Sequence, residues 1–484
     1  MILIDGQVRE LPTSLGGMLL SPYTRPAIMS MIHEPFTPAR PVTSTQQRAH
    51  LQIGTSTSHW RIHSLSLLVP DVEDDDESIE HFARRRLGSY VSNVLLPALT
   101  IGIYGGSTRH LSIRSCFPAL YSLEREHGSI VRGMLASAVG QVFGRRRRGE
   151  GSPSVVAEHA DSYCKWRESD DMAKQAKRTG VFSFRDGLQS LPDALVSYLS
   201  RQPHVQLRRD TRVAALEYTT ATGRINVLLH DNSLLEFDHV FSALPANKLG
   251  PIIRVENDGL LYEELSSVRF APMAIVNLVY ETAHLSHPMP SAFGYLVPPI
   301  EKQPILGVVF ESAAFPTVAD RGLTAITVML GGDSTLAAEQ GASLDLASQA
   351  DLQQPDALVT IALDAVRQHL NITAKPLVVD PSIYPAAMPQ YTVLDDFVLL
   401  LLHRPCRHRG VSLACTCTHV RICEQWLIQV GHAARLQRIE RLLAQTMPSF
   451  SLLGNSYHGI GINDCIRNAH IAVSRYLQQQ PQTQ

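Results

Sequence analysis

The residue types best suited to chemistry gather near the C-terminal end of the chain, in FSLLGNSYHGIGINDCI at residues 450–466. The mostly apolar run at 450–453 predicts a buried strand. Three glycines follow it, Gly454, Gly459 and Gly461, and a glycine turn lets the backbone approach a ligand closely. The stretch therefore predicts a strand that runs into a ligand-facing turn.

A helix is predicted to follow this turn, because Asn463 and Asp464 are favoured N-cap residues. Apolar residues then recur at near-helical spacing and form a stripe: Ile466, Ala469, Ala472, Val473 and Tyr476. A helix start presents unpaired backbone N–H groups and a positive dipole end, which suit an anionic or electron-rich group. An ordinary strand-to-helix connection has the same pattern, so the glycines alone leave both interpretations open.

A second group of candidate ligands consists of Cys406, His408, Cys415, Cys417, His419 and Cys423. Thiolates and imidazoles of this kind bind zinc. The spacing lacks paired C-x-x-C knuckles, however, and no strand or helix pattern frames the residues. We therefore assign no metal site.

The composition excludes several classes of protein. The chain has 484 residues, 44% of them hydrophobic, and a formal net charge of -2, so it should form two or three domains and has no global affinity for nucleic acid. The seven cysteines are not arranged as a secreted disulfide framework. No stretch approaches the roughly 20 apolar residues of a membrane-spanning helix, and we expect none.

The elements that must position the closing stretch are both strands and helices. Strands are predicted at residues 205–207, 213–218, 225–230, 234–237, 239–245, 274–280, 294–297, 306–310 and 325–330. Helices are predicted within residues 79–95, 188–199 and 356–370. This mixture, without a detectable internal repeat, indicates an α/β or α+β fold.

The first seven residues predict a strand that runs into a turn, with no signal or transit peptide before it. Because the chain starts directly on a predicted strand, we expect its beginning to be missing. Residues 42–70 contain no Asp or Glu and show no steady period, so we interpret them as an irregular insert. Between residues 15 and 32, proline-broken apolar segments either seat in one leaflet of a membrane or pack on the core.

Several stretches, taken together, resemble the protoporphyrinogen oxidases, flavin enzymes that make protoporphyrin IX in haem synthesis. They are LPT at 11–13, EHFARRRLG at 80–88, LSIRSCFP at 111–118, residues 182–195, HVFSALP at 239–245, FGYLVP at 293–298, LGVVFES at 306–312, VMLGG at 328–332, PQYT at 389–392 and the closing stretch. They cover most of the chain in the family's order, and the eukaryotic branch is the better match.

The resemblance implies an amine-oxidase-like α/β fold that binds FAD, with a mixed-sheet substrate domain and a helical membrane-binding domain. On that basis residues 1–160 form the helical membrane- and substrate-binding region, and residues 266–393 form the substrate domain. Residues 161–265 form part of the FAD domain, and residues 430–484 close it.

The resemblance also implies the reaction. Protoporphyrinogen IX would lose six electrons in three rounds, each passing a hydride from a methylene bridge to the flavin, with molecular oxygen as acceptor and hydrogen peroxide as product. Such chemistry needs orientation and a dry, apolar pocket more than an acid–base pair. No catalytic side chain is therefore assigned.

The resemblance assigns site residues position by position. Gly102, Phe293, Leu296 and Met329 match positions that line the substrate cavity; composition alone would place all four in the core. Val213 matches a position on the adenine side of FAD. The flavin-contacting positions of the closing segment are Asn455, Ile460, Gly461 and Ile462.

The chain also departs from the family. No G-x-G-x-x-G motif for the FAD pyrophosphate occurs in it, so we expect weak retention of FAD. Residues 42–70 and 394–429 have no counterpart, and we expect both to be non-native inserts.

Two other functions stay open on the sequence. One is another flavin enzyme of the amine-oxidase type, such as a polyamine oxidase or a carotenoid desaturase; the other is a cofactor-free porphyrin-binding or interaction protein. The resemblance further implies monotopic attachment to the mitochondrial inner membrane on its intermembrane-space side. It also allows a homodimer.

Overall fold

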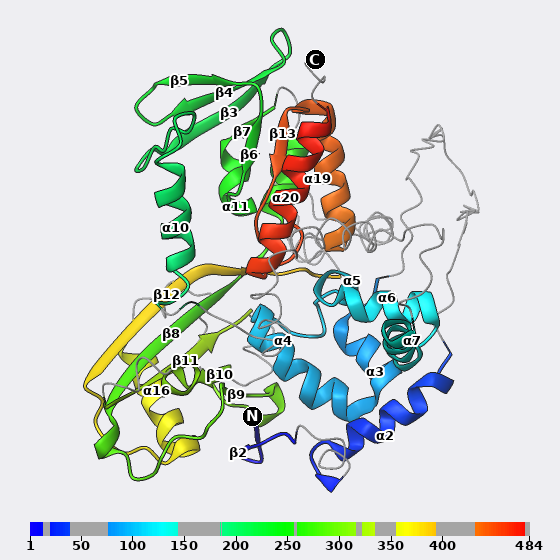
Figure 1. Cartoon of the computed structure of the whole chain (residues 1–484), viewed down its shortest axis with the longest axis vertical. Helices are drawn as coiled ribbons and strands as arrows, with labels where there is room; N and C mark the ends of the chain where they lie inside the picture. Colours follow the sequence, from blue (N-terminus) through cyan, green and yellow to red (C-terminus); the bar gives the residue numbers. More distant parts are fainter. Residues whose placement is uncertain are drawn as a thin grey trace, which may run out of the picture.

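The computed structural model divides into a large sheet, a group of helices and a second group of strands and helices (Figure 1). It describes residues 1–12, 20–38, 76–143, 184, 186–255, 259–315, 322–333, 355–393 and 431–479. The predicted inserts at 42–70 and 394–429, with the Cys and His cluster, lie outside the described residues.

A seven-stranded sheet is the largest element. Its order is β12 (Val378–Pro389), β8 (Phe270–Glu281), β11 (Leu323–Gly331), β10 (Gly307–Val309), β9 (Gly294–Leu296), β1 (Ile2–Ile4) and β2 (Gln7–Arg9). Neighbours are antiparallel except β1 and β9. Alternation along β8 gives the sheet two unlike faces, because successive side chains of a strand point to opposite sides.

One face of this sheet is fully buried under α16 (Pro355–Leu370). Ala274, Val276 and Leu278 of β8 belong to this core together with Leu358 and Val366 of the helix. The other face carries half-buried residues at the intervening positions of β8 and β11. The sheet thus has a closed side and an open side.

The N-terminal strand is confirmed, and it joins this sheet. Asp5 and Gly6 both have positive φ and make the turn between β1 and β2. Their N–H groups each donate to the Glu301 carboxylate at 3.0 Å. Residues 2–9 therefore pair with the sheet within 266–393, whereas the sequence assigned them to the helical region 1–160.

A second group combines two smaller sheets. One has the order β5 (Leu234–Phe237), β4 (Arg224–Leu229), β3 (Val213–Thr219) and β7 (Ile253–Arg254); in the other, β13 (Phe450–Leu452) lies parallel to β6 (Val240–Ser242). α11 (Ala246–Leu249), α12 (Gly259–Ser266) and α19 (His432–Thr446) share their core. The strand predicted at 205–207 is wrong, because this segment pairs with no strand and the positive φ of Asp210 turns the chain before β3.

Helices form the third group: α2 (Arg25–His33), α3 (Ile79–Tyr90), a π-helical turn (Val91–Leu95), α4 (Leu96–Tyr104), α5 (Ile113–Cys116), α6 (Pro118–His127) and α7 (Ile130–Phe143). Contrary to the sequence-based expectation, Ile79–Tyr104 is long and apolar enough to cross a membrane by composition. Half of its most apolar window is nevertheless buried within the protein, and Gly88 breaks its helical geometry with φ 81°. We interpret it as the core of the helical group.

Two elements differ from what their sequences indicate. β12 went unpredicted because Pro381 and Pro385 lie inside it; as an edge strand with a bulge it tolerates both. α10 (Ser190–Leu199) is confirmed as a helix, but it buries none of its residues. Leu195 and Tyr198 on it are more than half exposed.

A buried charge network joins the helices. The Arg86 side chain is fully buried and forms ion pairs with Glu34 at 3.5 Å and Glu124 at 2.9 Å. Glu34 in turn accepts from the N–H groups of Ile130 (2.9 Å) and Val131 (3.1 Å) at the start of α7. A buried charge is tolerated only when such partners are present.

Arg86→Met should therefore leave the fully buried Glu34 carboxylate without its cation, although Glu124 keeps Arg85, and lower the free energy of unfolding by about 3–5 kcal/mol. The matched control is Arg84→Met on the same helix, where the arginine is 59% exposed and pairs with Glu80; its cost should stay below about 1 kcal/mol. Urea unfolding of both variants measures the difference. Equal losses would contradict the network's role.

Candidate functional site

The closing turn connects β13 to α20 (Ile462–Gln479) as the sequence predicts, with one shift in the helix start. The helix begins at Ile462 rather than at the predicted caps, and Asp464 lies in its first turn, where a carboxylate complements the dipole. The first helical hydrogen bond, from the Cys465 N–H to the Gly461 carbonyl, spans 3.0 Å. The N–H groups before it remain available at the helix start.

Two glycines make this turn possible. Gly454 and Gly459 have φ of 96° and 113°, a region that other residues rarely adopt. A Cβ at Gly459 would also lie 2.8 Å from the Asp464 Cβ. The turn therefore needs glycine for both conformation and space.

The Tyr391 hydroxyl group supports the turn through hydrogen bonds to its backbone. This fully buried tyrosine donates its hydroxyl hydrogen to the Asn455 carbonyl and accepts the Gly459 N–H at 3.0 Å. Its ring stacks on His432, with centroids 3.9 Å apart. The Nε2–H of His432 donates to the Tyr457 carbonyl at 2.9 Å. Two side chains thus bind the backbone of three alternate residues.

The predicted cofactor residues fall in two places. Asn455, Ile460, Gly461 and Ile462 lie together in the turn and helix start. Val213 begins β3 and packs on the core of the four-stranded sheet instead. The helix after the turn buries none of its residues, and its apolar side chains Ile466 and Val473 are exposed.

Three of the four predicted substrate residues meet on the open face of the large sheet. Leu296 of β9 lies opposite Gly307 of β10, and Gly307 lies opposite Met329 of β11. Leu296 and Met329 therefore lie in one row and point to the same face of the sheet. α4 packs against β9 there. A Cβ added to Gly102 would lie 2.7 Å from the Leu296 Cδ2. Only a glycine lets the helix approach so closely.

Met329 belongs to a small apolar cluster at the same place. It packs with Met273 against Ile101 of α4 and Leu306, which are both buried. The row is therefore backed by apolar side chains from α4, from β8 and from the residue before β10. Such a surface suits a flat apolar ligand.

Phe293 does not join this group. Its side chain is 63% exposed, and the contact that fixes it is a hydrogen bond from the Phe310 N–H to its carbonyl at 2.9 Å. It lies immediately before β9, one residue ahead of Gly294. An exposed aromatic ring at this point is available to a ligand.

The sequence did not single out Gln390, Tyr391 and His432, although PQYT belongs to the resemblance. The place of Gln390 and Tyr391 directly after a strand could have drawn attention to them, but the prolines inside β12 kept that strand from being predicted.

Among the described residues, no three His, Cys, Asp or Glu side chains could hold a metal ion.

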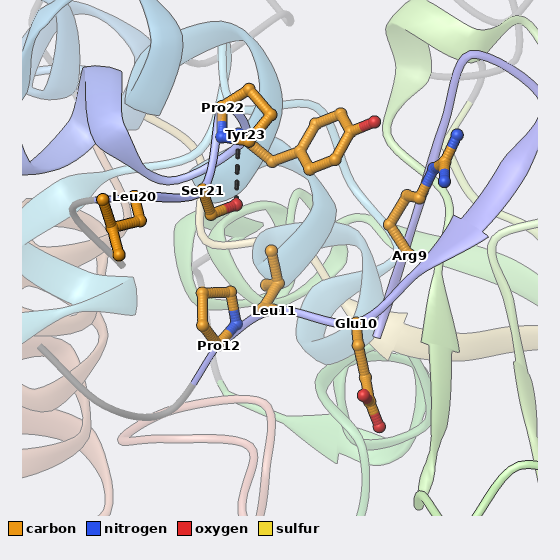
Figure 2. A pocket seen from close by; sticks show the side chains of 8 residues that line it. All are labelled: Arg9, Glu10, Leu11, Pro12, Leu20, Ser21, Pro22 and Tyr23. Atoms are coloured by element: carbon orange, nitrogen blue, oxygen red, sulfur yellow. Dashed lines mark hydrogen bonds between the residues drawn. The ribbon is translucent and has the colours of Figure 1, made fainter. Parts of the chain in front are cut away.

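A separate cleft of about 620 Å³ lies where the β2 end faces the start of α2, and Figure 2 shows its lining. The Arg9 guanidinium stands over the Tyr23 ring, 5.6 Å from its centroid. The Tyr23 N–H donates to the Ser21 Oγ at 3.3 Å. None of the predicted site residues lines this cleft.

Comparison with known proteins gives consistent results. The family model described as flavin containing amine oxidoreductase matches residues 19–371. A protoporphyrinogen oxidase from Bos taurus is 33% identical over 419 residues, covering 86% of this chain and 72% of that protein. The mitochondrial protoporphyrinogen oxidase of Nicotiana tabacum is 25% identical over 353 residues, covering 70% of this chain and 62% of that protein. The crystal structure of a putative protoporphyrinogen oxidase from Exiguobacterium matches with a TM-score of 0.56 at 18% identity, over 97% of this chain and 76% of that one.

His432 gives a test of the turn's support by pH. Burial, above all, lowers its pKa to about 3, against 6.5 ordinarily. As the pH falls below 6.5, the His432 imidazole is therefore protonated in the unfolded chain but not in the folded one. The free energy of unfolding decreases from pH 6.5 toward pH 3 for this reason. At pH 5 the loss relative to pH 7.5 should be about 2 kcal/mol from this residue.

His432→Gln should remove that part of the pH dependence in urea unfolding at pH 7.5 and 5.0. The matched control is His458→Gln, where the histidine is 46% exposed and pairs with Glu440; it should keep the wild-type slope. A wild-type slope in His432→Gln would show that the imidazole is not buried in its neutral form.

Proposed function

The chain belongs to the flavin containing amine oxidoreductases and, among them, to the protoporphyrinogen oxidase family; on this premise we propose that it oxidises protoporphyrinogen IX to protoporphyrin IX through FAD. The observation that carries the proposal is the meeting of Gly102, Leu296 and Met329. These residues come from α4, β9 and β11 and lie together on the open face. The relatives favour this activity over a polyamine oxidase or a carotenoid desaturase.

The closing turn fits the flavin ring of FAD. Its glycines bring the backbone to the surface, and the start of α20 offers free N–H groups. Asn455, Ile460, Gly461 and Ile462 would hold the ring, and Val213 would lie toward the adenine. When bound, FAD supplies the two-electron acceptor for a hydride from a methylene bridge.

The chain's own residues bind and orient the macrocycle. Leu296 and Met329 would offer an apolar wall, Gly102 lets α4 pack closely on Leu296, and the exposed ring of Phe293, just before β9, would contact the substrate. An apolar wall also excludes water, so orientation and desolvation replace an acid–base pair. No catalytic side chain is required for this part of the reaction.

We propose the membrane-facing surface on the helical group. Leu20 and Phe36 are 86% and 82% exposed, and Met29 and Ile32 between them are also exposed. The cleft of Figure 2 adjoins them and adds Arg9 and Tyr23, residue types that suit a membrane interface. Together they support monotopic attachment rather than a span.

The remaining assignments of this proposal follow the family. Residues 161–265 and 430–484 contribute to the FAD domain, 266–393 together with β1 and β2 to the substrate domain, and the rest of 1–160 to the helical region. Molecular oxygen is the acceptor, with hydrogen peroxide as product. The site of action is the mitochondrial inner membrane on its intermembrane-space side, and a homodimer is the assembly to test.

The activity is tested by mixing the full chain with excess FAD and protoporphyrinogen IX in air. Porphyrin fluorescence should rise faster than in the enzyme-free control, with peroxide formed alongside. A visible spectrum of the desalted protein reports flavin binding separately. Absence of both flavin binding and porphyrin formation would overturn the proposal.

The substrate assignment is tested by Phe293→Ala, which should raise KM about tenfold, since a buried aromatic ring contributes about 1.5–3 kcal/mol. The affinity for FAD should not change. Phe237→Ala is the matched control, because Phe237 is an exposed ring on β5. Loss of FAD from Phe293→Ala would mean that this residue belongs to the cofactor site.

The membrane surface is tested by the double variant Ile32→Ser, Phe36→Ser in a flotation assay with anionic vesicles. Wild-type protein should float with the vesicles, and the variant should stay in the soluble fraction. Leu234→Ser removes an exposed leucine of β5 and should float as wild type does. Unchanged flotation of the double variant would exclude this surface.

A further inference from the structure

We infer that Tyr391 and Gln390, two consecutive residues after β12, are positioning residues that place the flavin-facing turn and the substrate-facing helix relative to each other. The inference rests on the proposed function. It concerns neither the residues that touch FAD nor those that touch the porphyrinogen. It names the segment that holds both groups.

The hydroxyl group of Tyr391 makes two hydrogen bonds across the turn. It donates to the Asn455 carbonyl and accepts from the Gly459 N–H at 3.0 Å. These residues lie four apart, on either side of the bend, so one oxygen atom fixes the width of the turn. A hydroxyl can donate and accept at once, and a phenylalanine ring of the same shape can do neither.

Tyr391 is itself held on three sides. Its ring stacks on His432 at 3.9 Å and lies 6.1 Å from the Tyr104 ring. Its carbonyl accepts from the Ser112 N–H at 2.8 Å. The ring therefore has a fixed place, so its hydroxyl sets the place of the turn.

Gln390 holds the helix on the substrate side. Its Nε2 donates to the Tyr104 carbonyl at 2.8 Å, at the end of α4 and two residues after Gly102. The amide is 3% exposed and lies against Gly106, where an added Cβ would come within 2.0 Å of its Oε1. The fit leaves α4 little freedom to move along the sheet.

These contacts make residues 390–393 a short connecting segment, here called the strap, between two groups of candidate site residues. In Figure 1 the end of β12 passes between the helices α19 and α20 and the helices α4 and α5. Backbone hydrogen bonds fix the strap on both sides: the Val393 N–H donates to the His110 carbonyl at 2.7 Å, and the His432 N–H donates to the Thr392 carbonyl at 2.9 Å. A change on one side of the strap should leave the other side in place.

Tyr391→Phe tests the flavin side. Loss of two hydrogen bonds should weaken FAD binding about tenfold and shift the flavin absorption band, while KM for protoporphyrinogen IX stays within about twofold of wild type. Amide hydrogen exchange in residues 454–461 should accelerate without FAD present. Tyr295→Phe is the matched control, because its buried hydroxyl contacts His369 on the closed side of the sheet.

Gln390→Leu tests the substrate side and should give the reciprocal pattern. The KM for protoporphyrinogen IX should rise about tenfold, because the hydrogen bond to α4 is lost, while FAD affinity and exchange in residues 454–461 stay at wild-type values. A purely structural role would instead lower thermal stability and move both constants together in both variants. That result would overturn the inference.

Two further outcomes are decisive. If Tyr391→Phe does not fold, exchange of the Gly459 N–H in the unaltered chain without FAD replaces it: a protected amide supports the inference, and an unprotected one overturns it. If the unaltered chain binds no FAD, the proposed function fails, and exchange in Tyr391→Phe still decides whether the hydroxyl holds the turn. Wild-type exchange in a folded Tyr391→Phe overturns the inference.

Discussion

Three separately packed cores meet at residues 389–393, and the hydrogen bonds of this segment determine how the cores are placed. One core lies between the large sheet and α16, one among the helices, and one around α12 and α19. Each buries its own apolar residues and is stabilised by that burial. Tyr391 connects them at the junction: it packs in the helical core, stacks on His432 and binds the closing turn, and Ile460 of that turn packs on the helical core as well.

The large sheet supplies surface to this junction because only one of its faces is closed. α16 covers the face that carries Val276 and Leu278, and α4 packs on part of the other face, where Gly102 meets Leu296 and Ile101 packs with Met329. An apolar face left open in a folded protein is costly unless something covers it. A flat macrocycle would cover it, and this gives a physical reason for the half-buried row that includes Met329.

Elements with a periodic pattern of apolar residues or glycines were predicted from the sequence, and elements or contacts without such a pattern were missed. Alternation revealed β8 and β11, and the Gly459–Gly461 turn followed from glycine spacing. β12 escaped because Pro381 and Pro385 contradict a strand unless its place at the sheet edge is known. The false strand at 205–207 has the right side chains but no partner. Gly102, Leu296 and Met329 came from resemblance alone, since each looks like core by type, and Tyr391 acts through a tertiary contact that no local pattern encodes.

The proposed function requires that this chain pass electrons from protoporphyrinogen IX to FAD. The most direct measurement mixes the FAD-loaded chain with protoporphyrinogen IX without oxygen and follows the flavin absorption band. The band should bleach as the porphyrinogen is consumed and return when air is admitted. A band that persists in flavin-loaded protein, with the porphyrinogen unchanged, would contradict it.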